Sequence, residues 1–508
     1  MGRSNFIDRV VGWIDPAAGV ERAKARLALD VIQSHKVRNY EGASSGRRTD
    51  GWRSPNTSAK VATETAIIRL RNRSRDLTRN NPYASKALQV ISNNVVGTGI
   101  VPRFVASRQN RASKAKEVWR QWAETTQCDI EGRNTIYGLQ NLIMRTVAES
   151  GECLVRRVWK RGENGLALPF QLQILEPDYI DVSKDYLKPD EAGTQLIQGI
   201  KLNKEGKRIA YMLYDQHPGD NHLFSRNTSK EVPAEDIIHI YRVDRPGQIR
   251  GVPWSAPVII KLRDFDDHED AQLLRQKIAA CFAVFVTDSA AGELGTNGKP
   301  TSIADTVEPG IIETLPPGKT IQFADPPGVT GYNEYASTIL RGIAAGYGVT
   351  YESLTGDLNN VNFSSGRMGW IEFHRNVESW RWTMFIPQFC DSLWAWCTQA
   401  SVITANNISD VMVQWTPPKR EMIDPAAETK AAKEAVRAGF MTLPEAIREL
   451  GQDPDMVLAE HAETAKKLDD LGLILECDPR KTTQAGMLQV DPSQQGRGAN
   501  SNESNNNA

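Results

Sequence analysis

The chain has 508 residues, 40% of them hydrophobic and 24% charged, which is the balance of a globular protein with room for several domains. Its longest apolar run, 278–286, falls far short of the roughly 20 residues that cross a bilayer, so no membrane partner is expected. The formal net charge is −1, yet residues 1–120 hold 23 Lys/Arg against 9 Asp/Glu. A basic N-terminal quarter fits nucleic acid, an acidic partner or plain solubility, and charge alone does not choose among them.

The cysteines and histidines give no sign of a metal site. The six cysteines include no CxxC pair, and no histidine lies at zinc-finger spacing. We therefore expect reduced thiols in a cytoplasmic compartment. A phosphate-binding loop is also missing, because Glu313 stands where a glycine is required before Gly318, Lys319 and Thr320. No cofactor is expected.

The first half of the chain changes from a helical pattern to a strand pattern. Residues 1–60 contain turn signals and predict a loosely organised basic arm. Apolar spacing then predicts helices that begin near 61 and after the boundary at Asn81 and Pro82. Further helices are expected at 111–125 and 137–150, followed by short strands at 153–158, 170–175, 209–214 and 237–241.

The second half begins with a predicted long helix at 255–280 and then short strands and turns over 281–330. Helices near 425–439 and 443–450 follow the segment Trp415 to Pro418. The C-terminal tail is mostly Gln, Asn, Ser and Gly and is expected to be disordered, because it cannot bury apolar surface.

Between these parts, residues 342–384 are typical of a helix, a polar loop and a second helix. Residues 351–365 show neither a helical nor a strand period, and their Asp and Asn side chains favour turns. Ser364 or Ser365 is predicted to cap a helix over about 366–397 that kinks at Pro387. Its tryptophans suit either the core or a contact between subunits: Trp370, Trp380, Trp382, Trp394 and Trp396.

The densest acidic cluster lies on the predicted helix 255–280. A two-metal nuclease would need these carboxylates to converge on ions about 4 Å apart. Helical geometry spreads them instead, because Asp266 and Asp270 share one face while Asp264 and Asp267 share another. A solvated helix face is the plainest interpretation. An acidic wall along which DNA slides, and a nuclease site, remain alternatives.

Several unrelated short motifs, in a fixed order, resemble the lambda-type family of phage portal proteins. The resemblance covers roughly residues 60–460 and excludes the arm and the tail. The motifs are RDLTRNNPYA at 75–84, NVVGTGI at 94–100, ESGEC at 149–153, LEPD at 175–178, HIY at 239–241 and RGVPW at 250–254.

This resemblance implies an α+β portal fold and a ring oligomer, typically of twelve subunits. Each subunit would have an α/β wing, a two-helix stem, a small clip and a helical crown. The implied boundaries are 1–60 for the basic arm, 61–250 for the wing, 255–280 for the first stem helix, 281–330 for the clip, 333–348 for the second stem helix, 350–365 for the tunnel loop, 366–417 for a long helix and wing return, 418–480 for the crown, and 481–508 for the disordered tail.

The implied function is structural and not enzymatic. The ring would sit at a capsid vertex, where double-stranded DNA is packaged and ejected and where the packaging motor and head-completion proteins dock. Expected partners are the terminase large subunit, the major capsid and scaffold proteins and a head–tail adaptor, in the virion and in the host cytoplasm during assembly. Residues expected at the DNA channel are Asp357, Asn359, Asn360, Asn362 and Ser364 of the loop, and Lys261, Arg263, Asp264, Asp267, Asp270 and Arg275 of the stem.

Overall fold

The computed structural model divides the chain into two units, Met1–Ser58 and Ala59–Ala508, and every element below belongs to the second. The structure describes residues 55–160, 165–185, 193–220, 228–280, 284–288, 319–323, 331–359, 361–404, 406–419 and 421–475, with isolated positions before 55 and at 480. Most of the predicted basic arm, most of 281–330 and nearly all of the predicted tail lie outside the described residues.

The second unit begins with helices, and a capping residue separates two of them. The helices are α3 (Ala59–Glu64), α4 (Ile67–Asn80), α5 (Pro82–Val95) and, further on, α7 (Ile136–Ser150). Asn81 separates α4 from α5, and its side chain accepts a hydrogen bond from Ala84 N at 2.9 Å as the N-cap of α5. The predicted helix boundary at Asn81 and Pro82 is therefore confirmed.

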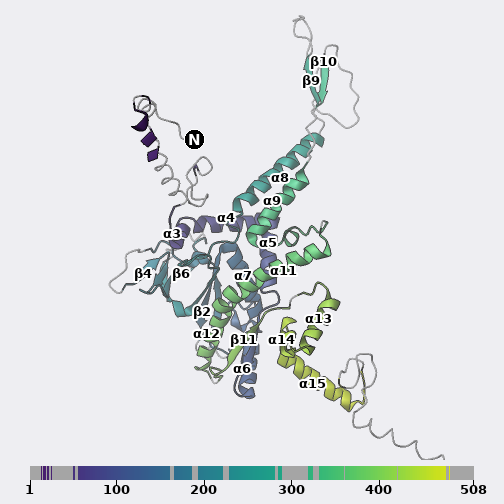
Figure 1. The fold of residues 1–508 in the computed structure, drawn as a ribbon. Coiled ribbons are helices and arrows are strands. Elements are labelled where there is room, and N and C mark those ends of the chain that lie inside the picture. The colour runs from purple at the N-terminus through teal and green to yellow at the C-terminus, as the bar shows by residue number, and fades with distance from the viewer. Residues whose placement is uncertain are drawn as a thin grey trace, which may run out of the picture. The chain divides into compact units, whose positions relative to one another are not determined.

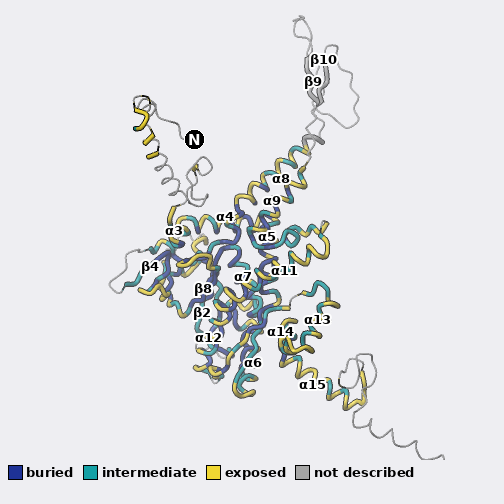
Figure 2. The backbone as a smooth tube through the Cα atoms, in the orientation of Figure 1, coloured by how far each residue is buried: buried dark blue, intermediate teal, exposed yellow. Residues whose placement is uncertain are grey.

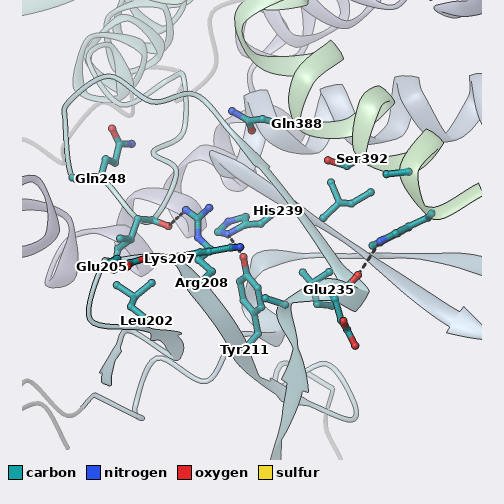
Figure 3. A pocket seen from close by; sticks show the side chains of 18 of the residues that line it. Leu202, Glu205, Lys207, Arg208, Tyr211, Glu235, His239, Gln248, Gln388 and Ser392 are labelled. Atoms are coloured by element: carbon teal, nitrogen blue, oxygen red, sulfur yellow. Dashed lines mark hydrogen bonds between the residues drawn. The ribbon is translucent and has the colours of Figure 1, made fainter. Parts of the chain in front are cut away.

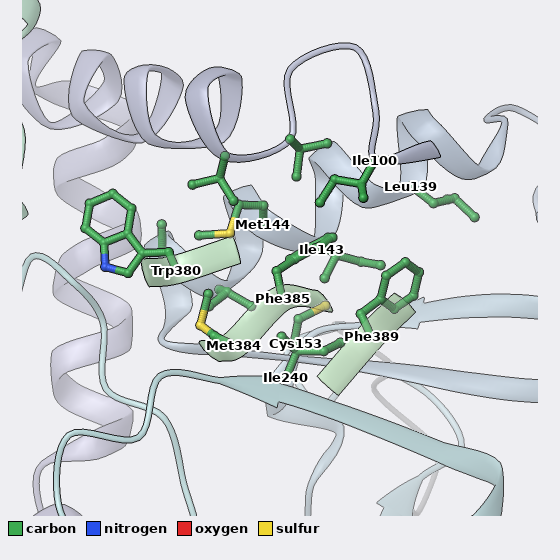
Figure 4. Close-up of a cluster of buried hydrophobic side chains, with 14 of the residues drawn as sticks. Ile100, Leu139, Ile143, Met144, Cys153, Ile240, Trp380, Met384, Phe385 and Phe389 are labelled. Carbon is green, nitrogen blue, oxygen red and sulfur yellow. The ribbon is translucent and has the colours of Figure 1, made fainter. Parts of the chain in front are cut away.

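The main core lies where α7 packs against the helical segment 363–401 and one sheet (Figures 2 and 4). Ile143 and Met144 of α7 meet Met384 and Phe385, with Cys153 on the adjoining strand. All five side chains are buried, so segments more than 200 residues apart in the sequence share one apolar interior.

A strand pair that the sequence did not predict closes this core. β1 (Val101–Val105) pairs antiparallel with β11 (Met412–Thr416), joining Val101 to Thr416 and Val105 to Met412. Helix α6 (Gln109–Trp122) follows β1 and packs Trp119 against Trp415, with ring centroids 6.1 Å apart. The pairing fastens the C-terminal part of the chain to its N-terminal helices.

The predicted β-rich part forms two antiparallel sheets. One has the order β3-β2-β8, with β2 (Glu152–Trp159), β3 (Phe170–Leu175) and β8 (Ile237–Tyr241). The other has the order β4-β5-β6-β7, with β4 (Gln195–Ile197), β5 (Ile200–Leu202), β6 (Arg208–Tyr214) and β7 (Ser229–Pro233). The four predicted strands of this part correspond to β2, β3, β6 and β8. A smaller core that includes Leu154, Tyr211 and Leu213 joins the two sheets.

Helices α8 (Ile259–Ala280) and α9 (Tyr332–Tyr347) lie side by side and antiparallel (Figure 1). The rings of His268 and Tyr335 are tilted relative to each other, with centroids 4.6 Å apart, while Gly342 lies beside Lys261. The predicted start at 255 is four residues early, because Val258 N donates to Ser255 O in a turn before the helix. Between α8 and α9, β9 (Val284–Asp288) pairs antiparallel with β10 (Lys319–Phe323).

The predicted long helix runs as α11 (Phe363–Trp380), a π-helical segment η5 (Arg381–Cys390) and α12 (Asp391–Ser401). Pro387 lies inside the π-helical segment, whose wider turn accommodates a residue that has no N–H to donate. Of its tryptophans, Trp380, Trp394 and Trp396 are buried, and Trp382 is 52% exposed. The prediction that the tryptophans belong to the core is therefore confirmed for Trp380, Trp394 and Trp396.

Three helices follow β11: α13 (Pro425–Arg437), α14 (Leu443–Glu449) and α15 (Pro454–Asp470). The sequence analysis missed α15, although Asp453 caps it and Pro454 opens it, both of which are helix-start signals. Within these three helices, the buried residues are Ile447 and Pro454 (Figure 2). No described helix combines the length and apolar character needed to cross a membrane.

Candidate functional site

The acidic residues of α8 do not share one environment, because Asp266 and Glu269 are half-buried while the others are exposed. Asp264, Asp267 and Asp270 are exposed, and Arg263 makes an exposed i,i+4 ion pair with Asp267 at 3.3 Å. Lys261 is also exposed and Arg275 is half-buried. Across the described residues, no three ligand atoms from this helix lie close enough to hold a metal ion. The convergence that a two-metal nuclease needs is therefore missing there.

Asp266 and Glu269 of α8, which the sequence did not place at the channel, bind neighbouring helices and hold α8 in place. Asp266 accepts a hydrogen bond from Asn81 Nδ2 at 2.6 Å, and Glu269 accepts one from the Tyr332 hydroxyl at 3.3 Å. Partial burial raises the pKa of both carboxyls above their ordinary values. The Asn81 side chain thus caps α5 with its Oδ1 atom and binds Asp266 of α8 with its Nδ2 atom.

The predicted loop at 351–365 is shorter in the structure. Helix α10 (Tyr351–Thr355) occupies its first third, because Thr350 caps that helix by accepting from Ser353 N at 3.1 Å. The cap of α11 is Asn362, not Ser364 or Ser365. Asn362 accepts from Ser365 N at 2.8 Å, and Ser365 Oγ accepts from Asn362 N at 3.2 Å, which is a capping box. The irregular part is therefore 356–362.

Asp357 organises the start of this segment. Its carboxylate accepts hydrogen bonds from the Tyr351 hydroxyl at 3.1 Å and from Asn359 N and Nδ2 at 3.1 and 2.9 Å. These bonds, the backbone one first, lower the pKa of Asp357. Asn360 lies outside the described residues, and Ser364 is exposed in the first turn of α11. The segment and this turn also expose Leu358 and Phe363, at 66% and 58%.

The most elaborate polar arrangement is a buried charge cluster around Glu152. Its carboxylate accepts six hydrogen bonds from five donor atoms, Arg250 Nε and Nη2, Arg71 Nη2, His239 Nε2 and Gly251 N, at 2.6–3.1 Å. The side chains of Glu152 and Arg250 are both 0% exposed. Burial alone would raise the pKa of Glu152, but the charge of Arg250 and the bond from His239 outweigh it, so this pKa lies well below its usual range.

His239 enters this cluster as a neutral ring. Burial lowers its pKa to about 4 although Glu152 favours the protonated form. At neutral pH its contact with Glu152 is therefore a hydrogen bond from Nε2–H and not an ion pair. Nδ1 is left as the acceptor, and it lies 3.4 Å from the Tyr211 hydroxyl (Figure 3).

The charge cluster extends through Asp178 to the protein surface. Asp178 contacts Arg71 at 3.3 Å and Arg75 at 2.6 Å. Glu176, Asp178 and His217 are near enough to one another to suggest a metal site. However, Arg75 Nη2 lies within 3.0 Å of both carboxylates and supplies the positive charge itself. We assign no metal to this group.

Sequence reasoning noticed these residues only as parts of separate motifs. Arg75, Glu152, Asp178, His239 and Arg250 come from five motifs that carried the resemblance, and the structure brings all five into one network. Composition and spacing held no signal for this convergence. In a sequence, an acid or an arginine that will be buried cannot be told from a surface residue. Only the positions of the strands and of α4 show that these residues are buried.

The comparisons with known proteins agree with the resemblance. Residues 45–381 match the family described as "Phage portal protein, lambda family". The chain is 25% identical over 432 residues to the probable portal protein of Halomonas phage phiHAP-1, covering 80% of this chain and 81% of the relative. It is 24% identical over 499 residues to portal protein B of Escherichia phage lambda, covering 85% and 90%.

Among solved structures, the neck of the native gene transfer agent particle contains a chain that is 13% identical, with a TM-score of 0.45, covering 77% of this chain and 94% of that one. Portal proteins are structural components of the capsid vertex and not enzymes, so the nuclease alternative has no support. With two thirds of its length matched by the family, this chain belongs to the lambda family of phage portal proteins.

Proposed function

We propose that this protein assembles into a closed ring of identical subunits, with twelve expected, through which double-stranded DNA enters and leaves the capsid. The family match over residues 45–381 carries the proposal. A closed ring needs head-to-tail contacts between two different surfaces of the subunit. Apolar side chains left exposed on several elements are available for them, among them Ile260 and Leu274 on α8 and Met368 on α11.

We assign the parts of the subunit by their order along the chain. The elements from α3 to β8 would form the wing, α8 and α9 the stem, and the β9–β10 hairpin between them part of the clip. The segment 356–362 would be the tunnel loop. The return through α11, η5, α12 and β11 would complete the wing, and α13–α15 would form the crown. The antiparallel contact of α8 with α9 supports this assignment, because it places both ends of the clip at one end of the stem.

The tunnel loop would face the channel with Asp357, Asn359, Asn360 and Asn362, together with Ser364 in the first turn of α11. No Lys or Arg lies between 351 and 365, so its contact with DNA would be steric or through amide hydrogen bonds. Little counterion release, and hence a shallow salt dependence, is expected of such a contact. The loop would guide the DNA and not grip it.

The exposed acids of α8 would give the stem a wall along which DNA slides. Lys261, Arg263 and Arg275 would make few phosphate contacts, and Arg263 is already paired with Asp267. The terminase large subunit, the major capsid and scaffold proteins and a head–tail adaptor would dock on the ring, with assembly in the host cytoplasm.

Native mass spectrometry and negative-stain imaging of concentrated protein test the ring directly, with and without scaffold and capsid proteins. We expect a closed oligomer with one dominant subunit number. A strictly monomeric species under all of these conditions would contradict the proposal.

A further inference from the structure

β8 is an edge strand whose outer side is only partly satisfied. In the sheet order β3-β2-β8, it pairs with β2 on one side alone. At its end, the side chain of Gln388 replaces a strand: Tyr241 N donates to Gln388 Oε1 at 3.0 Å, and Gln388 Nε2 donates to Tyr241 O at 3.1 Å. The backbone of Tyr241 therefore points outward, away from β2.

The backbone groups of His239 face outward as well, because the direction of these groups alternates along an antiparallel strand. Tyr241 lies opposite Glu152, and His239, two residues earlier, lies opposite Leu154. Residues two apart in a strand direct their backbone groups to the same side. The N–H and C=O of His239 thus face the same outer edge as those of Tyr241. Within the described residues, no group outside the sheet forms a hydrogen bond with them.

A cavity of about 880 Å³ opens beside this edge (Figure 3). Residues 237–239 form one wall, Leu202 and Tyr211 of the second sheet form another, and Ala395 and Trp396 of α12 form a third. This volume lies within the range of pockets that hold ligands, roughly 300–1,000 Å³. An extended chain in it would meet the free edge on one side and side chains of both layers on its two faces.

The charged residues that line the cavity favour an acidic partner segment. Lys60, Lys207 and Arg208 outnumber Glu205 and Glu235. Lys207 and Arg208 lie together on the side of His239 away from Glu235 (Figure 3). Both hydrogen bonds of Arg208, to the Tyr241 hydroxyl and to Ile249 O, leave from Nη2, so Nη1 remains for a carboxylate. Leu202, Ile237 and Ile249 supply apolar surface.

We infer that this cavity binds an extended segment of a partner protein, with alternating acidic and apolar residues, which adds as a strand to the outer edge of β8. Backbone hydrogen bonds to His239 and to the Ile237 carbonyl supply the attachment, and the alternation places carboxylates toward Lys207 and Arg208. Gln388 sets the end of the added strand, because it already occupies the next pair of backbone groups.

Synthetic peptides test the inference on the full chain. The first probe is a dye-labelled, amidated peptide of alternating valine and glutamate, and the second replaces glutamate by lysine. The third carries N-methyl groups on the edge that would face β8. In fluorescence anisotropy we expect the glutamate peptide to bind. The lysine peptide should bind about tenfold more weakly through charge. The methylated peptide should also bind about tenfold more weakly, through lost hydrogen bonds.

Matched substitutions locate the site. Ala395→Trp fills the cavity and should weaken binding of the glutamate peptide at least about tenfold. Thr398→Trp lies on the same helix outside the lining and should leave binding unchanged. Lys207→Glu should reverse the preference between the glutamate and lysine peptides. Lys204→Glu, in the same turn but outside the lining, should not.

Four results would overturn the inference. Equal binding of the methylated and unmethylated peptides would exclude strand addition. Absence of binding, or equal binding by the Ala395→Trp and Thr398→Trp variants, would exclude the cavity. If Ala395→Trp instead stops subunits from associating while Thr398→Trp does not, the occupant is a second copy of this chain and not a partner protein.

Discussion

Glu152 and Arg250 are joined by hydrogen bonds of 2.6, 2.9 and 3.0 Å, although neither side chain reaches solvent. The pair connects β2 to the turn that leads into α8, and Gly251 N binds the same carboxylate at 2.8 Å. A buried pair of this kind contributes little net stability by itself, but removing one partner leaves an uncompensated charge in the interior.

Glu152→Gln should destabilise the protein by about 3–5 kcal/mol, since Arg71 and Arg250 would lose their shared counter-charge. The shift of the urea unfolding midpoint measures this. Glu205→Gln, at an exposed position in the turn between β5 and β6, is the control and should change stability little. A Glu152→Gln midpoint equal to that of the control would mean that the cluster is not essential to the folded state.

Stability should fall as the pH drops from 6.5 to about 4. In this window the unfolded chain protonates His239 with its ordinary pKa of 6.5, whereas the folded chain holds that pKa at about 4. The unfolded state then binds more protons, so acid favours it, by on the order of 3 kcal/mol for this group. The lowered pKa of Glu152 adds a further loss at lower pH.

His239→Gln should flatten this dependence between pH 6.5 and 4, because glutamine does not titrate. Urea midpoints at a series of pH values compare the variant with the parent chain, and His217→Gln at the surface is the control. A parent and a His239→Gln variant with the same slope would show that other groups cause the acid sensitivity.

Deleting residues 358–361 should leave ring assembly intact and impair the packaging or retention of DNA. The deletion keeps Asn362, whose capping box starts α11, and removes little buried apolar surface. Negative-stain imaging checks the ring, and the DNA content of filled heads checks the channel role. Normal full-length packaging would exclude that role, and failure to form rings would make the segment an interface element.

Gly346→Ala should destabilise the contact between α9 and the turn before α8. A Cβ at this position would lie 2.2 Å from Val258 Cγ1, so one element must shift. Overpacking of this kind costs about 1–3 kcal/mol. Gly369→Ala, where the nearest atom is 3.8 Å away, is the matched control within a helix. Adding Val258→Ala should recover part of the loss, and no recovery would place the strain elsewhere.

The sequence by itself determined most of the secondary structure and the family. Strong local signals lay at Asn81 and Pro82, in the apolar spacing of α5 and α7, and in the alternating runs of β2, β3, β6 and β8. Two helix starts that the sequence analysis missed were also readable from local signals. Asn362 with Ser365 begins α11, and Asp453 with Pro454 begins α15. These features are readable because each depends on residues within one turn of one another.

Only the tertiary structure decided what lies together. β1 has no strong strand pattern and forms because β11, over 300 residues later, pairs with it. The buried charge of Glu152 is compensated because Arg71, Arg250 and His239 arrive from three other segments. The cavity beside β8 is lined by residues of both sheets and of α12. Burial and pairing depend on contacts between distant segments, and a carboxylate in a sequence carries no mark of the partners that will compensate it.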